Sequence, residues 1–290
     1  MFKGAMVALV TPFKNNEVDY KALEKLVEFQ ITSGTDGIVP VGTTGESPTL
    51  TYKEHKKVIE CVVKTTAGRV PVIAGAGSNN TAEAVELAEF AEKIGADATL
   101  QVCPYYNKPT QDGLYEHFKA IAEGVDLPVV LYNIPGRCAG EGLYPETVAE
   151  LYKLKNIVAI KEATGSLDMA SMVGSLCDIT ILSGDDSLTL PLASVGAKGV
   201  ISVVGNVVPQ DVKKFVELIL AGDFSTAREW HFKLFELSKT MLKLATNPIP
   251  VKAAMAMLGM IEDEIRLPMT KLPADGQEKI RAALTAYGLL

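Results

Sequence analysis

The sequence lacks the features that mark several classes of protein. Its four cysteines and three histidines are scattered without metal-ligand spacing, so neither a disulfide framework nor a zinc site is indicated, and we expect no cofactor. Basic residues are outnumbered, 28 against 35 acidic ones, and the net charge of −7 argues against nucleic acid or an anionic membrane as a partner. No apolar run approaches the length of a membrane span, and the start does not resemble a signal peptide. These absences predict a reduced, cytoplasmic protein.

Eight short apolar runs, rich in β-branched residues, alternate with segments of helical spacing. Strands that are apolar on both faces, each followed by a helix, indicate a parallel sheet, and eight such units predict an α/β fold of the (β/α)8 TIM-barrel type. An open doubly wound sheet is the rival, but it would need a Gly-x-Gly-x-x-Gly turn, and 75–80 lacks the third glycine. The runs cover 5–10, 37–41, 70–74, 98–103, 129–133, 157–161, 179–183 and 199–203, and the helical segments cover 20–33, 52–65, 82–94, 112–123, 145–154, 167–176, 186–195 and 209–221.

The pattern changes after Gly222. Helices are expected over 225–244, 250–258 and 274–287, with no strand among them. We therefore predict a catalytic barrel over 1–224 and a C-terminal α-helical appendage over 225–290. Helices that simply cap the barrel would give the same pattern; we favour an appendage used for assembly.

Lys161 ends one of the apolar runs, and a polar loop that contains a glycine follows it. Apolar runs lie before and after this one, which places the lysine at the carboxyl end of an interior strand. Burial disfavours the charged form of an amine, so a lysine in this position can act as a nucleophile and form a Schiff base with a keto substrate. A strand-end lysine that reaches solvent or pairs with an acid is the ordinary alternative.

The side chains at the carboxyl ends of the strands converge on one mouth in a barrel of this type. Taken singly, they have ordinary interpretations: a tight turn, buried aromatics, a surface arginine. Asp185 and Asp186 could hold magnesium, although acidic capping of a helix is favoured. Placed around one lysine, the set offers a nucleophile, hydroxyls that transfer protons and an arginine for a carboxylate. Besides Lys161, it consists of Thr43, Thr44, Tyr105, Tyr106, Tyr132, Arg137, Gly184 and Ile201.

Six stretches resemble the dihydrodipicolinate synthase family of pyruvate-dependent class I aldolases. The resemblance runs from residue 2 to residue 290 and implies condensation of pyruvate with L-aspartate 4-semialdehyde, to give 4-hydroxy-tetrahydrodipicolinate in lysine and diaminopimelate biosynthesis. A retro-aldolase of a sugar-derived 2-keto acid, similar to N-acetylneuraminate lyase, and a non-catalytic barrel that senses a small acid are the alternatives. The stretches are 4–13, 41–47, 104–109, 131–137, 160–165 and 247–252.

The resemblance also implies roles for individual residues. Lys161 would form the Schiff base, and Thr43, Tyr132 and Tyr106 would relay protons, with Tyr106 lent by a neighbouring subunit of a homotetramer built as a dimer of dimers. Thr44 would hold the pyruvate carboxylate and Arg137 the carboxylate of the aldehyde, while Gly184 and Ile201 would line the lysine pocket. Thr44, the tyrosine pair and Arg137 favour the synthase over the sugar-acid lyases.

Two further features follow from the resemblance. After Arg137 the segment 138–146 is one residue longer than is common in the family and lacks the usual threonine. This segment is expected to lie beside the second substrate, so the difference concerns the identity of that substrate. Lysine-inhibited members bind L-lysine in a cleft at the dimer interface. The matching positions here are Ser47, Pro48, Tyr52, His55, Asn79, Glu83 and Tyr105, and we expect partial feedback inhibition.

Overall fold

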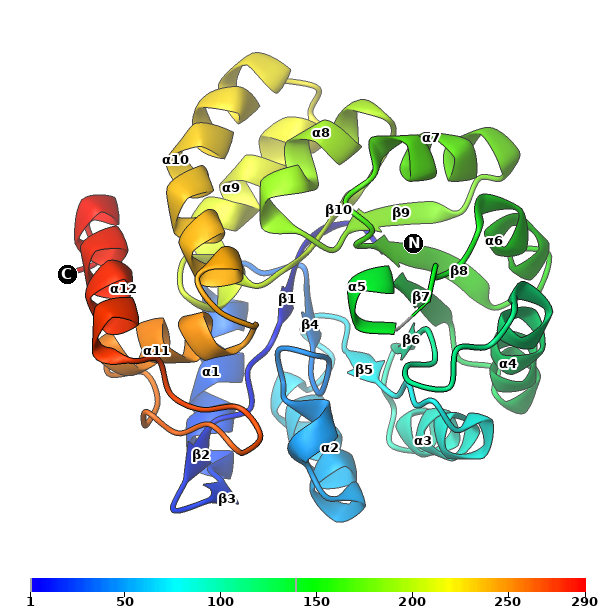
Figure 1. The fold of residues 1–290 in the computed structure, drawn as a ribbon, viewed down its shortest axis with the longest axis horizontal. Coiled ribbons are helices and arrows are strands. Elements are labelled where there is room, and N and C mark those ends of the chain that lie inside the picture. The colour runs from blue at the N-terminus through cyan, green and yellow to red at the C-terminus, as the bar shows by residue number, and fades with distance from the viewer. Residues whose placement is uncertain (1, 139) are drawn as a thin grey trace.

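Eight parallel strands form the barrel in this computed structural model, which describes residues 2–138 and 140–290 (Figure 1). The strands are hydrogen-bonded in the order β4-β1-β10-β9-β8-β7-β6-β5, and a parallel bridge between Ile38 and Val72 joins the β4 and β5 ends. The predicted fold is therefore confirmed. The strands are β1 (Gly4–Ala8), β4 (Gly37–Val39), β5 (Ile73–Gly75), β6 (Ala98–Val102), β7 (Val129–Asn133), β8 (Ile157–Glu162), β9 (Thr180–Ser183) and β10 (Gly199–Ser202).

A helix follows each barrel strand, and several of the helices begin at a side chain that caps the first backbone amides. The Asp19 side chain accepts a hydrogen bond from the Ala22 amide, Thr51 forms a capping box with Glu54, and Asn80 caps the third helix. The surrounding helices are α1 (Tyr20–Thr32), α2 (Tyr52–Thr66), α3 (Thr81–Lys93), α4 (Gln111–Gly124), α6 (Pro145–Leu151), α7 (Leu167–Leu176), α8 (Thr189–Ser194) and α9 (Pro209–Leu220).

Local structure differs from the sequence-based expectation at several places. Strand β5 begins at Ile73 rather than at residue 70, because Pro71 has no N–H to donate to a ladder. The expected helix over 186–195 is divided into a 3-10 turn, η2 (Asp186–Leu188), and α8. A hairpin of β2 (Phe13–Lys14) and β3 (Glu17–Val18) was not expected; Asn15 and Asn16 make its turn, both with positive φ.

Apolar side chains fill the inside of the barrel, so it is a packed core and not a channel. A second and larger apolar cluster lies between the strands and the helices. The interior cluster consists of Phe2, Met6, Ala8, Val39, Ile73, Ala98, Leu100, Val130, Tyr132, Ala159, Leu182 and Ile201. The polar side chains that could bind a substrate are therefore expected at the ends of the strands.

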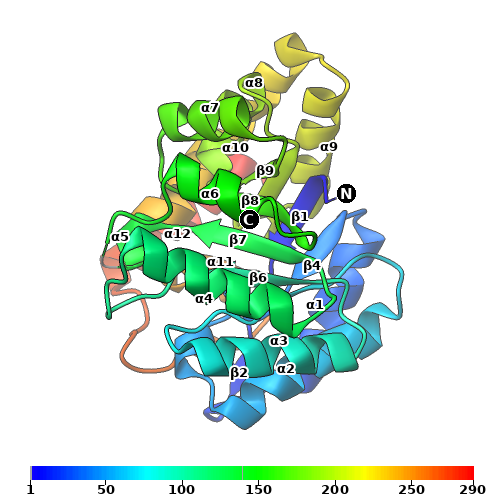
Figure 2. The same cartoon turned by 90° about the vertical axis from the view of Figure 1, so that its right-hand side faces the viewer.

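The carboxyl end of the barrel carries three short elements that bear on the site. A four-residue helix, α5 (Pro135–Cys138), follows β7 directly and lies beyond the tip of that strand (Figure 2). A 3-10 turn, η1 (Ser47–Thr49), follows the loop after β4, and another, η3 (Val204–Asn206), follows β10.

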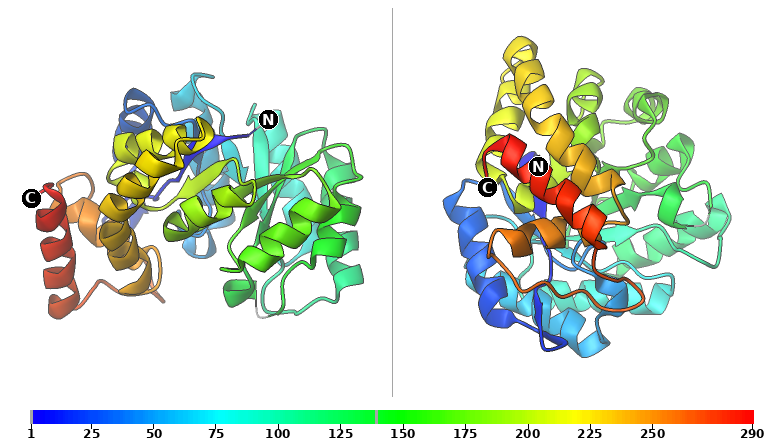
Figure 3. Two further views of the ribbon diagram at one scale, coloured as in Figure 1. Left: turned by 90° about the horizontal axis from the view of Figure 1, so that it is seen from above. Right: turned by 60° about the vertical axis from the view of Figure 1, so that its left-hand side comes forward.

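Three helices, α10 (Phe224–Lys243), α11 (Ile249–Met257) and α12 (Ala274–Tyr287), complete the chain (Figure 3). Helix α10 packs against α9 and η2, and α11 packs against η3. The expected domain boundary falls at the start of α10, and the division into 1–224 and 225–290 stays a prediction. Within the described residues, none of the helices combines the length and apolar character that a membrane crossing requires.

Candidate active site

Lys161 lies on β8 between Tyr132 of β7 and Leu182 of β9, its partners in the sheet register. Its side chain faces the barrel interior and is 5% exposed, and Nζ lies 4.1 Å from the centre of the Tyr132 ring. No carboxylate pairs with it in any ion pair found among residues 2–138 and 140–290. An unpaired amine at the top of a packed barrel is available to a carbonyl carbon.

A cavity of about 470 Å3 opens above this amine. Of the residues predicted from the sequence, Thr43, Thr44, Tyr132, Arg137 and Gly184 line it together with Lys161. The other lining residues are Ile134, Gly136, Ala163, Thr164, Asp185, Val203, Leu242, Lys243, Thr246 and Asn247. The structure thus brings most of the predicted set into one pocket.

Gly184 lets the lysine reach this pocket. A Cβ at this position would lie 2.7 Å from the Ala163 Cβ and 3.2 Å from the Lys161 Cε. The Gly184 amide donates to the Glu162 carbonyl over 2.7 Å, which fixes the close approach of the two strand ends. A larger residue would clash with Ala163 and press on the lysine side chain.

The turn that carries Thr43 and Thr44 is held from below. Val41 and Glu46 at its two ends both adopt positive φ, 54° and 56°, a conformation that costs free energy unless the surroundings impose it. The Glu46 carboxylate is fully buried and pairs with the Lys252 ammonium at 2.5 Å. Lys252 also donates to the Thr11 carbonyl over 3.0 Å. These contacts lock the turn.

Asn247 was not assigned to the site from the sequence, although it opens one of the six family-like stretches. Its side-chain amide donates to the Thr44 hydroxyl over 3.0 Å, and its carbonyl accepts a hydrogen bond from Arg137 over 3.1 Å. Its Oδ1 is buried and has no hydrogen-bond partner among the described residues. Asn247 therefore links the two predicted carboxylate-binding residues and leaves one acceptor for a substrate N–H or O–H.

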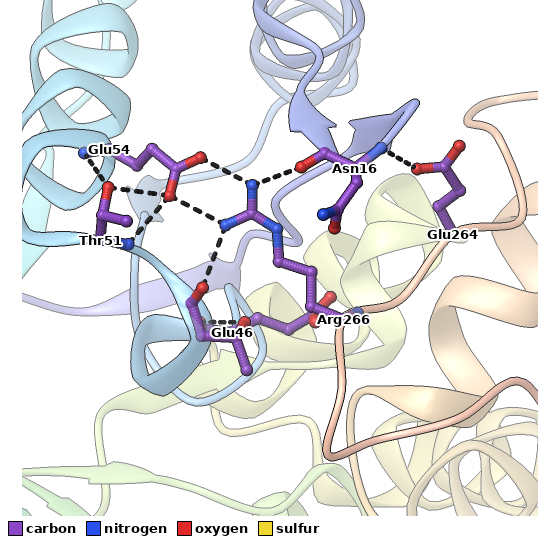
Figure 4. Close-up of polar contacts among 7 residues, drawn as sticks. Asn16, Glu46, Thr51, Glu54, Glu264 and Arg266 are labelled. Atoms are coloured by element: carbon purple, nitrogen blue, oxygen red, sulfur yellow. Dashed lines mark hydrogen bonds and ion pairs between the residues drawn. The ribbon is translucent and has the colours of Figure 1, made fainter.

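Arg266 extends the same bracing from the segment between α11 and α12 (Figure 4). Its guanidinium pairs with Glu54 of α2 at 2.6 Å and donates to the Asn16 carbonyl over 2.7 Å. Its backbone amide donates to the Glu46 carboxylate over 3.2 Å. The C-terminal region thus lines part of the cavity and also holds the turn with Thr43 and Thr44 in place.

Two buried carboxyl groups, Glu162 next to the lysine in the chain and Asp186 after β9, do not line the cavity. Burial raises the pKa of Glu162, against hydrogen bonds from Thr164, and burial likewise raises the pKa of Asp186. Asp186 accepts hydrogen bonds from the Val203 and Val204 amides, which ties η2 to the end of β10, and Asp185 caps η2. Among the described residues no group of three or more acidic, histidine or cysteine side chains is arranged to hold a metal. The expected capping is found at Asp185, whose side chain accepts from the Ser187 amide, and not at Asp186.

Three residues of the predicted set lie outside this cavity, and one of them, Tyr105, lines the separate cleft described below. Ile201 belongs to the packed barrel interior. Val203, which follows β10 directly, lines the cavity instead. Tyr106 is 86% exposed with a φ of 72°, so its side chain leaves its own barrel. Within the single chain, neither Ile201 nor Tyr106 lines the cavity above Lys161.

Most of the residues predicted to bind lysine line a separate cleft of about 190 Å3. The His55 ring nitrogen Nε2 lies 2.7 Å from the Gly75 carbonyl, and burial lowers the pKa of this histidine. Ser78 donates to one oxygen of Glu83 over 2.9 Å. The cleft is lined by Ser47, Pro48, Leu50, Tyr52, His55, Gly77, Ser78, Glu83, Leu87 and Tyr105. Asn79, the remaining predicted residue, donates to the Tyr105 carbonyl instead.

Comparisons with known proteins agree with this geometry. The 4-hydroxy-tetrahydrodipicolinate synthase of Geotalea uraniireducens is 54% identical over the full length of both chains. A dihydrodipicolinate synthase structure from Acinetobacter baumannii, complexed with pyruvate, superposes with a TM-score of 0.97 at 44% identity and 100% coverage of both chains. One from Cyanidioschyzon merolae with lysine bound gives 0.96 at 42% identity, covering 100% of this chain and 99% of that one. The model of the dihydrodipicolinate synthetase family matches residues 1–287, and this chain belongs to that family.

Proposed function

We propose that this chain is a lyase that condenses pyruvate with L-aspartate 4-semialdehyde and gives 4-hydroxy-tetrahydrodipicolinate, a step of lysine and diaminopimelate biosynthesis. The observation that carries the proposal is the buried, unpaired Lys161 amine at the floor of a cavity lined by Thr43, Thr44 and Arg137. The full-length likeness to synthases of this name supports the same reaction.

The reaction begins at the lysine. Lys161 Nζ attacks the ketone carbon of pyruvate and water leaves, which forms an iminium. Loss of a methyl proton then gives an enamine, whose carbon attacks the aldehyde and forms the new C–C bond. The amine of the adduct attacks the iminium carbon, closes the ring and expels the lysine. Thr43 and Tyr132, both on the cavity wall, are suited to move these protons.

Two places in the cavity suit the two substrate carboxylates. The Thr44 hydroxyl accepts its hydrogen bond from Asn247 and so keeps its own proton for the carboxylate of pyruvate. Arg137 lies on the outer side of the cavity, where a charge-assisted contact would select the carboxylate of the aldehyde. Gly184 supplies backbone beside the lysine, and Ile201 supports the site from within the barrel.

We further propose that Tyr106 completes the relay of a neighbouring subunit. Its exposed side chain and positive φ suit a residue that reaches into a partner. The assembly would be a homotetramer arranged as a dimer of dimers, because most soluble oligomers have closed symmetry. The cytoplasm is the proposed location, supported by four cysteines that are free thiols.

A coupled assay tests the choice of reaction. Aspartate semialdehyde with pyruvate should be turned over, whereas N-acetylneuraminate and 2-keto-3-deoxygluconate should release no pyruvate. Turnover of either sugar acid at a comparable rate would favour the retro-aldolase alternative. A chain that turns over none of them and forms no pyruvate adduct at Lys161 would be a sensor.

L-lysine is the proposed inhibitor, bound in the separate cleft. Glu83 offers a carboxylate to the α-ammonium of lysine, Asn79 and Tyr105 suit its carboxylate, and His55 with nearby carbonyls suits its side-chain ammonium. Tyr105 precedes Tyr106 directly, so that a ligand in the cleft has a short route to the relay. Pro48 and Tyr52 line the cleft in place of the smaller residue and the histidine that the family resemblance leads us to expect there, and inhibition is therefore expected to be partial.

Glu83→Ala should abolish inhibition by L-lysine, because the cleft then loses its only acidic side chain among the lining residues. Inhibition of the unmodified chain should be stronger for L-lysine than for D-lysine. Glu89→Ala, an exposed change on the same helix, is the matched control and should leave inhibition intact. Unchanged rates at millimolar lysine and no heat of binding in calorimetry would contradict the proposal.

A further inference from the structure

Two cysteines meet beside the active site, and the reaction does not use them. Cys103 directly follows β6 and precedes the loop that carries Tyr105 and Tyr106. Cys138 is the last residue of α5 and directly follows Arg137. The pair therefore joins the two segments that carry the exposed catalytic tyrosine and the arginine.

Both cysteines line a cavity of about 380 Å3 that is distinct from the one above the lysine. Lys108 and Glu141, both exposed, also line this cavity, so it is in contact with solvent. The two thiols are otherwise buried, at 1% and 3% exposure. A small reagent can approach them from the cavity side, while a protein-sized one cannot.

The two thiols are unequal. The Cys138 Sγ donates to the Cys103 carbonyl over 3.1 Å. The interaction of the two side chains lowers the pKa of Cys138 and raises that of Cys103, and the Arg137 charge also lowers the pKa of Cys138. Cys138 directly follows the Arg137 cation and is the more exposed of the two thiols, at 3% against 1%. Because the thiolate is the reactive form, Cys138 is assigned as the attacking sulfur and Cys103 as the resolving one.

We propose that Cys103 and Cys138 form a dithiol site that reacts with low-molecular-weight disulfides and closes to an intramolecular disulfide. The Cys138 thiolate attacks one sulfur of the reagent, forms a mixed disulfide and releases one reagent thiol. The Cys103 thiol then loses its proton, attacks Cys138 Sγ and releases the second reagent thiol. The protein is oxidised by two electrons and the reagent disulfide is reduced to two thiols.

The other two cysteines provide an internal comparison. Cys61 and Cys177 are free, half-buried and far from this cavity in the sequence. Burial raises the pKa of each of these thiols. They are more exposed than the dithiol site, so a reagent that reacts by exposure alone would modify them first.

Closing the disulfide would move Arg137. Cys138 Sγ must turn from the Cys103 carbonyl to the Cys103 sulfur, which draws the end of α5 toward β6. The Arg137 contact with the Asn247 carbonyl, 3.1 Å in the thiol form, would then be lost. This consequence rests on the proposed function, because it assigns Arg137 to the aldehyde substrate; formation of the disulfide itself does not.

Peptide mapping tests the site on the full chain in its native assembly. Treated with glutathione disulfide, the protein should lose two hydrogens and yield a peptide that links Cys103 to Cys138 before Cys61 or Cys177 is modified. Cys103→Ser should instead hold glutathione on Cys138, and Cys138→Ser should form no adduct at Cys103. First modification at Cys61 or Cys177, or no reaction at either residue of the pair, would overturn the proposal.

Kinetics test the consequence separately. The oxidised chain should lose about tenfold or more in kcat/KM for the aldehyde and recover with dithiothreitol, while borohydride trapping of pyruvate at Lys161 stays unchanged. Cys103→Ser with Cys138→Ser should be insensitive to the reagent. A linked pair with unaltered kinetics would overturn the link to Arg137. A chain with no condensation activity would contradict the proposed function and leave the mapping result intact.

Discussion

Two lysines are buried at the same end of the barrel, and they differ in what faces the amine. Lys161 is 5% exposed and Lys252 is 2% exposed. Lys252 pairs with the buried Glu46 carboxylate at 2.5 Å and donates to a backbone carbonyl. Lys161 has the face of Tyr132 at 4.1 Å and a cavity of about 470 Å3. The Lys252 amine is held by two acceptors, one of them an anion, and the Lys161 amine is open to a ligand.

The comparison shows that burial alone does not make a lysine a nucleophile. Burial lowers the pKa of Lys252, and the Glu46 carboxylate opposes that shift. Because its protons are held by an anion and a carbonyl, its lone pair is not available for attack. The two lysines therefore have different roles. Lys252 fixes the turn that carries Thr43 and Thr44, and Lys161 is the reactive amine of the pocket that this turn helps to form.

Lys161→Ala should give the largest effect, the loss of all detectable turnover and of the pyruvate adduct. The barrel should stay folded, because the side chain lies at a cavity and makes no ion pair within the described residues. Turnover with aspartate semialdehyde and circular dichroism check the two halves. A variant with residual Schiff base would place the nucleophile elsewhere.

Lys252→Met should act on stability. Removing one partner of a buried ion pair leaves an uncompensated charge and typically costs about 3–5 kcal/mol in the free energy of unfolding. Urea unfolding measures this change. Lys153→Met is the matched control, because Lys153 pairs with Glu150 at the surface, where both side chains are more than half exposed, and it should change little. An equal loss of stability in both variants would contradict the distinction between the buried and the surface ion pair.

Arg137→Ala should mainly weaken use of the aldehyde. Losing a charge-assisted contact costs about 2–5 kcal/mol, and the lower figure suits an exposed arginine, so kcat/KM for the aldehyde should fall about thirtyfold. Steady-state kinetics with each substrate varied in turn provide the measurement. A variant impaired only in pyruvate binding would contradict the assigned role.

Tyr106→Phe should slow turnover by roughly tenfold, less than the about 10²–10⁴-fold that a proton-transfer group typically contributes, because Thr43 and Tyr132 keep the rest of the relay. Mixing this variant with Lys161→Ala subunits sharpens the test, since a shared site would pair an intact Tyr106 with an intact lysine. Activity should rise after the subunits exchange. No gain on mixing, or a fully active monomer in ultracentrifugation, would show that the tyrosine is not shared.

Sequence patterns predicted the barrel and the main polar residues around the lysine because these residues lie at or just beyond the ends of strands, and strand ends converge by geometry. Strand β7 was predicted to the residue. The ion pair that holds the turn with Thr43 and Thr44 was not predicted, because Lys252 and Glu46 lie 206 positions apart and only tertiary packing brings them together. Asn247 stood in a family-like stretch, but its contacts with Thr44 and Arg137 could not be read from spacing.

Borohydride reduction in the presence of pyruvate, followed by peptide mass mapping, tests the difference between the two lysines most directly. The account predicts one modified residue, Lys161, with the added mass of reduced pyruvate, and an unmodified Lys252 in the same digest. A label on Lys252, or none on Lys161, would contradict it.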